Sequence, residues 1–413
     1  MMKVSQTAAL ALTAALNGAC GSRSPASHPK PSAGALTPAT TTDAGSAKDA
    51  GDALSVTLRN PLAVPRANEN IALAVAALRK AVPRLDVRNI LMVDPRGNPV
   101  LSQLVDVDGD ESPDEVVFQT DLGANESKTF KLRVGQRHPA SRTEFKVYGR
   151  FVRERHDDFA WENDVVAHRV YGPDLETWKK KPLTSSGVDT WSKRVPRLVV
   201  NDWYMTDDYH QDHGEGADFY SVGESRGCGG LGIWAGDKLR VSKNFVRSRV
   251  LANGPIRLVF ELDYAPWEAG GSRVAETRRV ILDAGTHFNR FESRFSGQQG
   301  ALPVGLGIAK HTGNAIQVDA RSGWMRTWEP LDGDPSGRLG CAIVLPPTSR
   351  AEEQHTESDY LLITPAPTSG VLVYYVGSAW DRGGDIPDAA AWTREIQSLS
   401  SRLAAPVQVE LGP

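Results

Sequence analysis

The chain has 413 residues and a formal net charge of −3, with 47 Lys and Arg residues mixed evenly among 50 Asp and Glu residues. This balance, without a basic stripe, argues against a nucleic-acid or anionic-membrane partner. The length allows one large domain or two closely packed domains behind an N-terminal tail.

Residues 1–20 have the plan of a secretory signal peptide, because Lys3 precedes an apolar run that ends in small residues and Cys20. A cysteine after small residues is typical of the site at which bacterial lipoproteins are cleaved and lipidated. We therefore expect an exported lipoprotein of the periplasm or outer membrane, anchored at Cys20. Plain secretion and a cytoplasmic location are the alternatives. No stretch reaches the ~18 apolar residues that a membrane-spanning helix needs.

Residues 21–53 are rich in Ser, Pro, Ala, Thr, Gly and Asp and contain no aromatic residue. Such a segment buries too little apolar surface to offset its ordering entropy, so we expect a disordered linker. After it we expect a smaller N-terminal β-domain over 54–135 and a larger β-sandwich domain over 136–413.

The rest of the chain consists mostly of short alternating or β-branched runs separated by Gly, Pro, Asn and Asp, which is the pattern of strands. The fold class predicted from this pattern is mostly β, with a large β-sandwich and a short C-terminal helix. The predicted strands of the larger domain are 145–153, 197–200, 256–264, 278–282, 288–295, 370–376 and 407–411.

Two helices are predicted. Residues 70–80 are rich in Ala and Leu. After Asp388, the side chains of Trp392, Ile396, Leu399 and Leu403 recur at steps of four, three and four, which is one apolar helical stripe.

An acidic turn between predicted strands at 100–105 and 115–119 is a candidate calcium site. Alternating carboxylates around a glycine can supply the oxygen ligands that Ca²⁺ prefers, although no glutamate stands at the twelfth position of the loop. The alternative is an acidic turn that only closes a hairpin. The candidate metal ligands are Asp106, Asp108, Asp110 and Asp114.

Polar residues are unusually dense between 159 and 172, and such density in a strand is costly unless the groups are used or fully paired. If the segment is one strand, Glu162, Asp164 and His168 share one face, and Asn163, Arg169 and Tyr171 the other. Trp161 offers a flat face for stacking on a sugar ring. The alternative is a strand whose polar groups form buried pairs.

A second candidate segment combines two histidines and several carboxylates with glycines, in a loop running from Tyr209 to Gly230. These residues suit acid–base catalysis or metal binding, and the alternative is a surface loop with incidental histidines. His311 is a weaker candidate. Cys228 and Cys341 are interpreted as two separate buried thiols, with a disulfide as the alternative.

These segments resemble the bacterial domain-of-unknown-function family 4861, which is often found among exported sugar-degradation proteins. The resemblance covers roughly residues 54–413. It implies a β-supersandwich similar to galactose-mutarotase-like and polysaccharide-lyase domains, and it does not fix a reaction. Val165 stands where the family commonly has an arginine. The matching segments are 157–164, 169–173, 209–216, 225–230, 253–257, 276–279 and 374–381.

The leading functional hypothesis is a polysaccharide lyase that cleaves a uronate-containing glycan by β-elimination. This reaction needs a group that neutralises the uronate carboxylate, a base for the C5 proton and an acid for the leaving oxygen. Arg169 and Asn163 are the candidates for the first role, His210 or His213 for the base, and Tyr209 or Tyr171 for the acid.

The first alternative is a glycoside hydrolase that uses Glu162 with Glu215 or Asp212. The second is a glycan-binding module that uses Trp161, Trp203 and Trp380 as stacking faces. The candidate catalytic residues are His210, His213, Tyr209, Glu162, Arg169 and Glu215. The candidate substrate-binding residues are Trp161, Asn163, His168, Tyr171, Asp212, Arg226 and Trp380.

Overall fold

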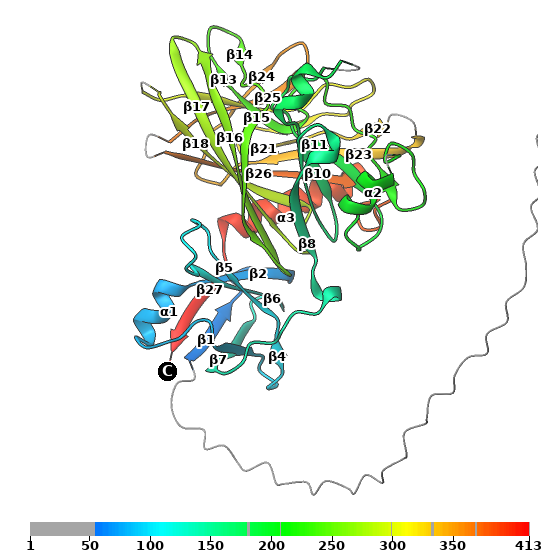
Figure 1. Cartoon of the computed structure of the whole chain (residues 1–413). Coiled ribbons are helices and arrows are strands. Elements are labelled where there is room, and N and C mark those ends of the chain that lie inside the picture. The colour runs from blue at the N-terminus through cyan, green and yellow to red at the C-terminus, as the bar shows by residue number, and fades with distance from the viewer. Residues whose placement is uncertain are drawn as a thin grey trace, which may run out of the picture. The chain divides into compact units, whose positions relative to one another are not determined.

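The computed structural model describes residues 54–412, apart from 180, 181, 207, 299, 332, 333, 368 and 369, and it gives no side-chain burial for 334–336. The expected signal peptide, the linker and Cys20 lie outside the described residues. The described chain is mostly β, with a C-terminal helix, as the sequence predicts (Figure 1). No helix in the described part is both long and apolar enough to cross a membrane.

The first part of the chain forms two small sheets around their own core, which includes Leu58, Leu78, Phe118 and Phe130. The three-stranded sheet has the order β2 (Arg66–Ala74), β6 (Glu115–Leu122), β5 (Ser102–Val105). The five-stranded sheet has the order β27 (Gln408–Gly412), β1 (Leu54–Arg59), β7 (Ser127–Val134), β3 (Ile90–Val93), β4 (Pro99–Val100). The last strand of the chain therefore lies beside the first described one (Figure 1).

The predicted helix over 70–80 is only half correct. Residues up to Ala74 belong to β2, which pairs antiparallel with β6, and only α1 (Val75–Ala81) is helical. The pairing with β6 therefore overrides the helical propensity of the Ala- and Leu-rich segment.

A nine-stranded antiparallel sheet is the largest of the described sheets. In β17 the burial alternates residue by residue, so that Val280 and Leu282 face the core while Arg279 lies on the other face. The order is β15 (Phe245–Asn253), β16 (Arg257–Ala269), β17 (Ser272–Asp283), β18 (Phe288–Ser296), β26 (Val371–Trp380), β23 (Asp334–Val344), β21 (Trp324–Arg326), β20 (Gln317–Asp319), and β22 (Glu329–Leu331) pairs with β23.

Two further five-stranded sheets contribute to the same hydrophobic core. The first has the order β12 (Gly216–Ala217), β11 (Asp189–Lys193), β10 (Ala167–Val170), β9 (Asp158–Asn163), β8 (Val147–Val152). The second has the order β14 (Leu239–Arg240), β13 (Cys228–Trp234), β19 (Pro303–Ala309), β25 (Asp359–Pro365), β24 (Glu352–His355). Three 3₁₀ turns cover Arg142–Glu144, Arg153–Arg155 and Pro173–Thr177.

The C-terminal helix α3 (Ala389–Ala404) begins where the sequence predicts. The Asp388 side chain accepts a hydrogen bond from Ala391 N at 2.7 Å, and Trp392 and Ile396 are fully buried. The indole of Trp392 stacks on Phe288 and lies over Gly340, where any Cβ would approach the indole to about 2.6 Å.

Two local predictions are wrong. Residues 197–200 form no strand, because Val199 N and Val200 N donate to the Glu162 carboxylate and α2 (Val200–Thr206) begins there. Cys228 and Cys341 are not separate thiols but form a disulfide that joins β13 to β23. The bond therefore links two different sheets.

Candidate active site

The segment expected as one strand at 159–172 is a hairpin. Strands β9 and β10 pair antiparallel, and Asn163 Oδ1 accepts hydrogen bonds from Val165 N and Val166 N at the turn, both at 2.8 Å. Asn163 Nδ2 donates to the carbonyls of Asp283 and Thr286. Because the chain reverses at this turn, residues 162–171 do not lie on one strand, and the predicted sharing of faces is wrong. Both faces of β9 are covered, and Asn163 has a structural role in the turn.

Trp161 and His168 are fully buried. The Trp161 Nε1 donates to Asn289 Oδ1 at 2.7 Å, and the indole packs between His168 and Phe260. Burial lowers the pKa of His168 to about 3, so its imidazole is neutral. Neither side chain can contact a sugar at the surface, which corrects their predicted role in substrate binding.

Glu162 is held by three donors inside the fold. Lys193 Nζ, Val199 N and Val200 N donate to its carboxylate at 2.8, 2.8 and 2.7 Å, and the side chain is fully buried. Such a carboxylate cannot reach a glycosidic bond, so the predicted hydrolase pair that uses Glu162 is wrong.

Arg169 is the centre of a buried charge cluster, which corrects its predicted role as a carboxylate clamp. Its guanidinium forms ion pairs with Asp158 (3.4 Å), Asp189 (2.8 Å) and Asp218 (2.6 Å), and it donates to Tyr209 Oη at 3.3 Å. Arg169 of the first candidate segment therefore meets Tyr209 and Asp218 of the second beneath the surface. The cation already faces three protein carboxylates and is 6% exposed.

Burial dominates the electrostatics of this cluster. It raises the pKa of Asp158 to about 7 and that of Asp218 well above its usual range, against the attraction of Arg169. The Tyr171 hydroxyl donates a hydrogen bond to Asp189 Oδ2 at 2.7 Å, and burial raises the pKa of Tyr171. A phenol held this way inside the core cannot protonate a leaving group, so Tyr171 is structural.

The loop after Tyr209 lies at the surface, but its residues do not share one pocket. The side chains of His210 and His213 are 59% and 65% exposed, and His213 Nε2 contacts Asp208 at 2.9 Å. His213, Glu215 and the largely buried Tyr209 border a depression of about 820 Å³, and His210 is not among the residues that line it. Glu215 is paired with Arg197.

Arg226 also lies away from any surface site. It is 2% exposed, and its guanidinium donates to Ser186 Oγ at 2.9 Å and to the Glu224 carbonyl at 3.2 Å. Burial lowers its pKa to about 10. The predicted contact between Arg226 and substrate is therefore wrong.

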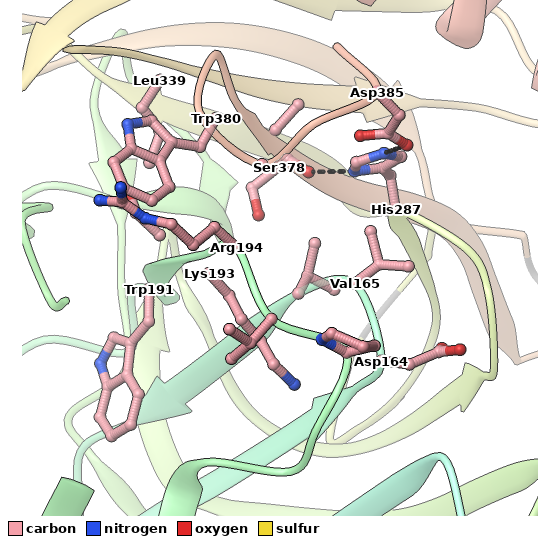
Figure 2. Close-up of a pocket in the computed structure, with 16 residues that line it drawn as sticks. Asp164, Val165, Trp191, Lys193, Arg194, His287, Leu339, Ser378, Trp380 and Asp385 are labelled. Carbon is pink, nitrogen blue, oxygen red and sulfur yellow. Dashed lines mark hydrogen bonds and ion pairs between the residues drawn. The ribbon is translucent and has the colours of Figure 1, made fainter. Parts of the chain in front are cut away.

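A pocket of about 630 Å³ lies where the end of β11, the start of β18 and the end of β26 meet (Figure 2). We call it the Arg194 pocket. Its lining comes from five separate parts of the chain, at 164–166, 191–196, 287, 339 and 378–385. Its chemically important lining residues are Asp164, Lys193, Arg194, His287, Trp380 and Asp385.

His287 is fixed on one side of this pocket between two acceptors. Its Nδ1 faces the Ser378 carbonyl at 2.9 Å, and its Nε2 faces Asp385 Oδ2 at 2.8 Å (Figure 2). Because a carbonyl only accepts, Nδ1 carries a hydrogen and Nε2 is the atom left for proton transfer. Burial lowers the pKa of His287, but the bonds to Asp385 and Ser378 outweigh it and the pKa is raised.

Arg194 forms the opposite side of the pocket. Its guanidinium lies over the Trp380 indole and forms an ion pair with Asp212. Its side chain is 28% exposed, whereas Trp380 is 3% exposed because Arg194 and Phe219 pack on its ring. Trp380 therefore lines the pocket beneath Arg194 and offers no open stacking face. Asp212 acts on Arg194 and does not itself line the pocket.

Lys193 and Asp164 complete the lining. Lys193 Nζ is bonded to Glu162 and to the Asn163 carbonyl at 2.6 Å. Asp164 Oδ1 accepts from Gly285 N at 2.6 Å, and the side chain is 15% exposed. Figure 2 shows the Asp164 and Asp385 carboxylates on the same side of the pocket as His287.

Sequence reasoning missed His287, Asp385, Lys193 and Arg194. His287 and Asp385 are 98 positions apart, and neither stands in a dense polar segment. The only available signal was the pair of adjacent cations at the end of a strand.

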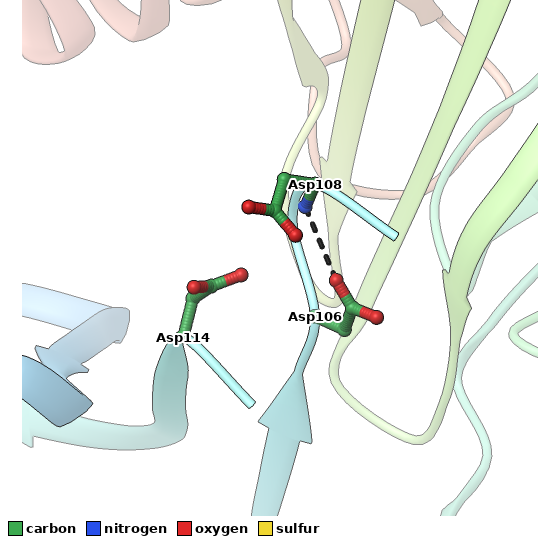
Figure 3. A group of neighbouring side chains, drawn as sticks. All are labelled: Asp106, Asp108 and Asp114. Carbon is green, nitrogen blue, oxygen red and sulfur yellow. Dashed lines mark hydrogen bonds between the residues drawn. The ribbon is translucent and has the colours of Figure 1, made fainter. Parts of the chain in front are cut away.

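The acidic turn keeps three of its four predicted ligands together. Oxygens of Asp106, Asp108 and Asp114 lie within 4.8 Å of one another, at the surface (Figure 3). Asp110 Oδ1 instead accepts from Ser112 N at 2.7 Å. Asp106 already accepts hydrogen bonds from Gly109 N and Glu111 N. The three carboxylates fit a calcium ion, and the internal hydrogen bonds equally fit a turn that closes the β5–β6 hairpin.

Comparisons with known proteins place the sequence in a wider context. The model of a family described as a domain of unknown function (DUF4861) matches residues 58–409. An uncharacterized protein, P7, of Formosa agariphila is 34% identical over 377 residues, which cover 86% of this chain and 93% of that protein.

Two solved structures from Enterococcus faecalis are similar over 87% of this chain. One is a protein in glycosyl hydrolase family 38 (10% identity, TM-score 0.47), and the other is an alpha-mannosidase (9% identity, TM-score 0.42). The chain spans about half the length of these two proteins, 47% and 46%.

Proposed function

The chain belongs to the domain-of-unknown-function family 4861, and we propose that it is an exported carbohydrate-active enzyme that cleaves a uronate-containing glycan by β-elimination. The observation that carries this proposal is that Arg194 and His287 line the same pocket from opposite sides. The cation can neutralise the uronate carboxylate, and the proton-transfer group facing the same cavity can serve first as the base and then as the acid of β-elimination.

Arg194 is assigned to the uronate carboxylate. Neutralising this group makes the neighbouring C5 proton more acidic, because negative charge spreads onto the carboxylate as the proton leaves. A guanidinium suits a carboxylate because it can donate two parallel hydrogen bonds. Its position on the Trp380 ring and the ion pair with Asp212 hold it in place before substrate arrives.

His287 Nε2 is assigned to proton transfer. In its neutral form this nitrogen takes the C5 proton, the C4–O4 bond breaks, and a double bond forms between C4 and C5. The departing oxygen then takes up a proton, which the same imidazolium can return. In the resting structure Asp385 covers Nε2, and its side chain is 61% exposed, so substrate can displace it.

A hydrolase is the second candidate, and one observation favours it. Asp164 and Asp385 both line the Arg194 pocket, and a pair of carboxylates is what most glycoside hydrolases use. This pair replaces the one that contained Glu162. A protein that only binds glycans is the third candidate.

The test is incubation with polygalacturonate, alginate, glucuronan and hyaluronan, with ultraviolet absorbance of the new C4–C5 double bond and total reducing ends measured together. A lyase raises both signals. A rise in reducing ends alone overturns β-elimination in favour of hydrolysis, and binding without either product overturns both.

Two variants connect the activity to the pocket. Arg194→Gln and His287→Gln should each lower kcat/KM by about 10²-fold, the size expected for one electrostatic or proton-transfer group. The matched controls are Arg197→Gln, which changes an exposed arginine paired with Asp202, and His355→Gln, which changes an exposed histidine paired with Glu353. If the controls lose as much activity as the pocket variants, the assignment to this pocket fails.

Export and a lipid anchor are part of the same proposal. The Cys228–Cys341 disulfide supports an oxidising compartment, since such bonds persist mainly outside the cytosol. Cys20→Ala should release the protein from the membrane fraction or block its processing. Unchanged fractionation of that variant would contradict the anchor.

A further inference from the structure

A second pocket lies beside the first. It has a volume of about 950 Å³, and its lining includes Phe219, Lys310, His311, Thr312 and Glu329. We call it the His311 pocket. No step of the proposed reaction uses any of these residues.

His311 is held in the same way as His287. Its Nε2 faces the Ser221 carbonyl at 2.7 Å, and its Nδ1 faces Glu329 Oε1 at 2.9 Å. A carbonyl only accepts hydrogen bonds, so Nε2 carries a hydrogen, while Nδ1 faces the carboxylate. The histidine side chain is 26% exposed, whereas Glu329 is 3% exposed. The imidazole therefore faces the pocket more than the carboxylate does.

The two pockets share a wall. The ring of Phe219, in the His311 pocket, packs on the ring of Trp380, in the Arg194 pocket, with 5.9 Å between centroids. The strands agree with this contact. Glu329 of β22 is opposite Leu339 of β23, and Leu339 is opposite Trp380 of β26. Two strand spacings separate Glu329 from Trp380, or about 10 Å along the sheet.

We infer that the His311 pocket is a second sugar subsite, which takes an acidic sugar unit next to the one bound in the Arg194 pocket. This inference rests on the proposed function, because it assumes that the Arg194 pocket binds a uronate. It adds that the protein binds two neighbouring units of an acidic polymer, one on each side of the Phe219–Trp380 pair.

The chemistry of the second pocket fits this class of ligand. Lys310 supplies positive charge, His311 supplies an imidazole, and the half-buried Phe219 supplies an apolar surface against which the carbon face of a sugar ring can pack. Lys310 Nζ is tied to the Thr356 carbonyl at 2.6 Å, which fixes its charge near the pocket instead of leaving it in bulk solvent. The same polarity would disfavour a neutral, apolar ligand.

The inference predicts a dependence on substrate length. A polymer that fills both pockets gains contacts that a short oligosaccharide in the Arg194 pocket alone does not. His311→Gln removes the imidazole that faces the pocket and should weaken the binding of polymer about tenfold while leaving the binding of the shortest bound oligosaccharide unchanged. Thr312→Trp, at an exposed position of the same pocket, blocks the space without removing the His311–Glu329 pair and should have the same effect.

Binding is measured first, by affinity electrophoresis in gels that contain each of the four polysaccharides used above and by calorimetry with their size-graded oligosaccharides. The control is His355→Gln, the same substitution at an exposed histidine–glutamate pair on β24. Melting temperatures of all variants show whether they fold. If His311→Gln does not fold, Thr312→Trp decides.

The outcomes separate the two proposals. Wild-type binding that is weakened by both pocket variants supports the subsite, even if no polymer is cleaved, in which case only the proposed reaction fails. Cleavage and binding unchanged in both variants overturn the subsite and leave the proposed function standing. A wild-type protein that binds none of the polymers overturns both.

Discussion

Arg194 and Asp212 form an ion pair that connects the Tyr209–Gly216 loop to the Arg194 pocket. The same guanidinium lies with its central carbon 4.5 Å from the centroid of the Trp380 ring. Asp212 Oδ1 also accepts hydrogen bonds from Gly214 N and Gly216 N, so the loop backbone fixes the carboxylate that in turn fixes the arginine. Asp212 is thus a positioning residue for the cation assigned to the substrate.

Asp212→Asn should therefore raise KM for a uronate polymer about tenfold, or ~1.4 kcal/mol of binding free energy, with a smaller change in kcat. The amide oxygen can keep the bonds to the loop backbone, so the fold is retained while the charge pair is lost. Steady-state kinetics measure the split between KM and kcat. The control is Asp202→Asn, at a carboxylate paired with Arg197. Equal losses in both variants would mean that Asp212 has no particular link to the pocket.

Asp385→Asn should shift the acid limb of the kcat/KM profile to lower pH. The bond to Asp385 helps to raise the pKa of His287, so its removal lets the imidazole lose its proton at lower pH. A base is active when it is neutral, and activity therefore begins at lower pH in the variant. The profile of Asp237→Asn, at an exposed turn, should match the wild type. A shift toward higher pH would contradict the assignment of His287 as the base.

Asp158→Asn should flatten the dependence of stability on pH. The folded-state pKa of Asp158 is about 7, above its usual 3.8, because the carboxyl is buried. As pH rises from 4 to 7 the unfolded chain loses this proton while the folded protein keeps it. The wild type therefore loses stability across this window, with a slope of up to ~1.4 kcal/mol per pH unit from this group.

The neutral amide of Asp158→Asn removes that slope. Denaturant unfolding at several pH values measures it, with Asp237→Asn as the control. Parallel stability curves for wild type and Asp158→Asn would show that the buried carboxyl stays ionised.

Calcium binding at the acidic turn predicts a melting temperature that is higher in calcium than in a chelator. An ion present at about 100 times its Kd stabilises the folded state by ~2.7 kcal/mol. Asp108→Asn should remove the difference, whereas Asp94→Asn, at another exposed turn, should keep it. A wild-type melting temperature that is the same in both buffers decides for a turn that merely closes the hairpin.

Replacing Cys228 and Cys341 by alanine should lower the melting temperature by several degrees. The disulfide closes a loop with a sequence separation of 113, and such long loops correspond to about 4–5 kcal/mol in the chain-entropy model. A reductant that reaches the bond should destabilise the wild type by a similar amount and leave the double variant unaffected. A double variant as stable as the oxidised wild type would contradict a structural role.

Regular elements of this fold can be predicted where local pattern and tertiary context agree. The stripe of Trp392 and Ile396 identifies α3, and the alternation in β17 identifies a strand with two different faces. Prediction fails where the backbone amides of a segment bond to a group from a distant part of the chain. At Val199 and Val200 the amides bind a side-chain carboxylate instead of a strand, which no local pattern reveals.

The candidate site is harder to predict, because a sequence segment rich in polar residues can be either exposed to solvent or buried. The Trp161–Arg169 segment looks chemically active, but the structure uses its polar groups to satisfy one another inside the protein. His287 meets Asp385 across 98 positions, in segments of ordinary composition. Only the three-dimensional arrangement shows that these two side chains face the same pocket.

The pairing of β27 with β1 has a consequence for biosynthesis. Every residue of β1 from Ser55 to Arg59 has a partner between Gln408 and Gly412. On the ribosome, that edge of the first strand stays unpaired until residues 408–412 have been translated. This sheet therefore begins with an early segment of the chain but is completed only by a much later one. A chain that had to be threaded through a membrane would leave this edge of β1 unpaired until residues 408–412 had passed. Removal of residues 408–412 would leave the same edge exposed in the finished protein, as a template for pairing between molecules.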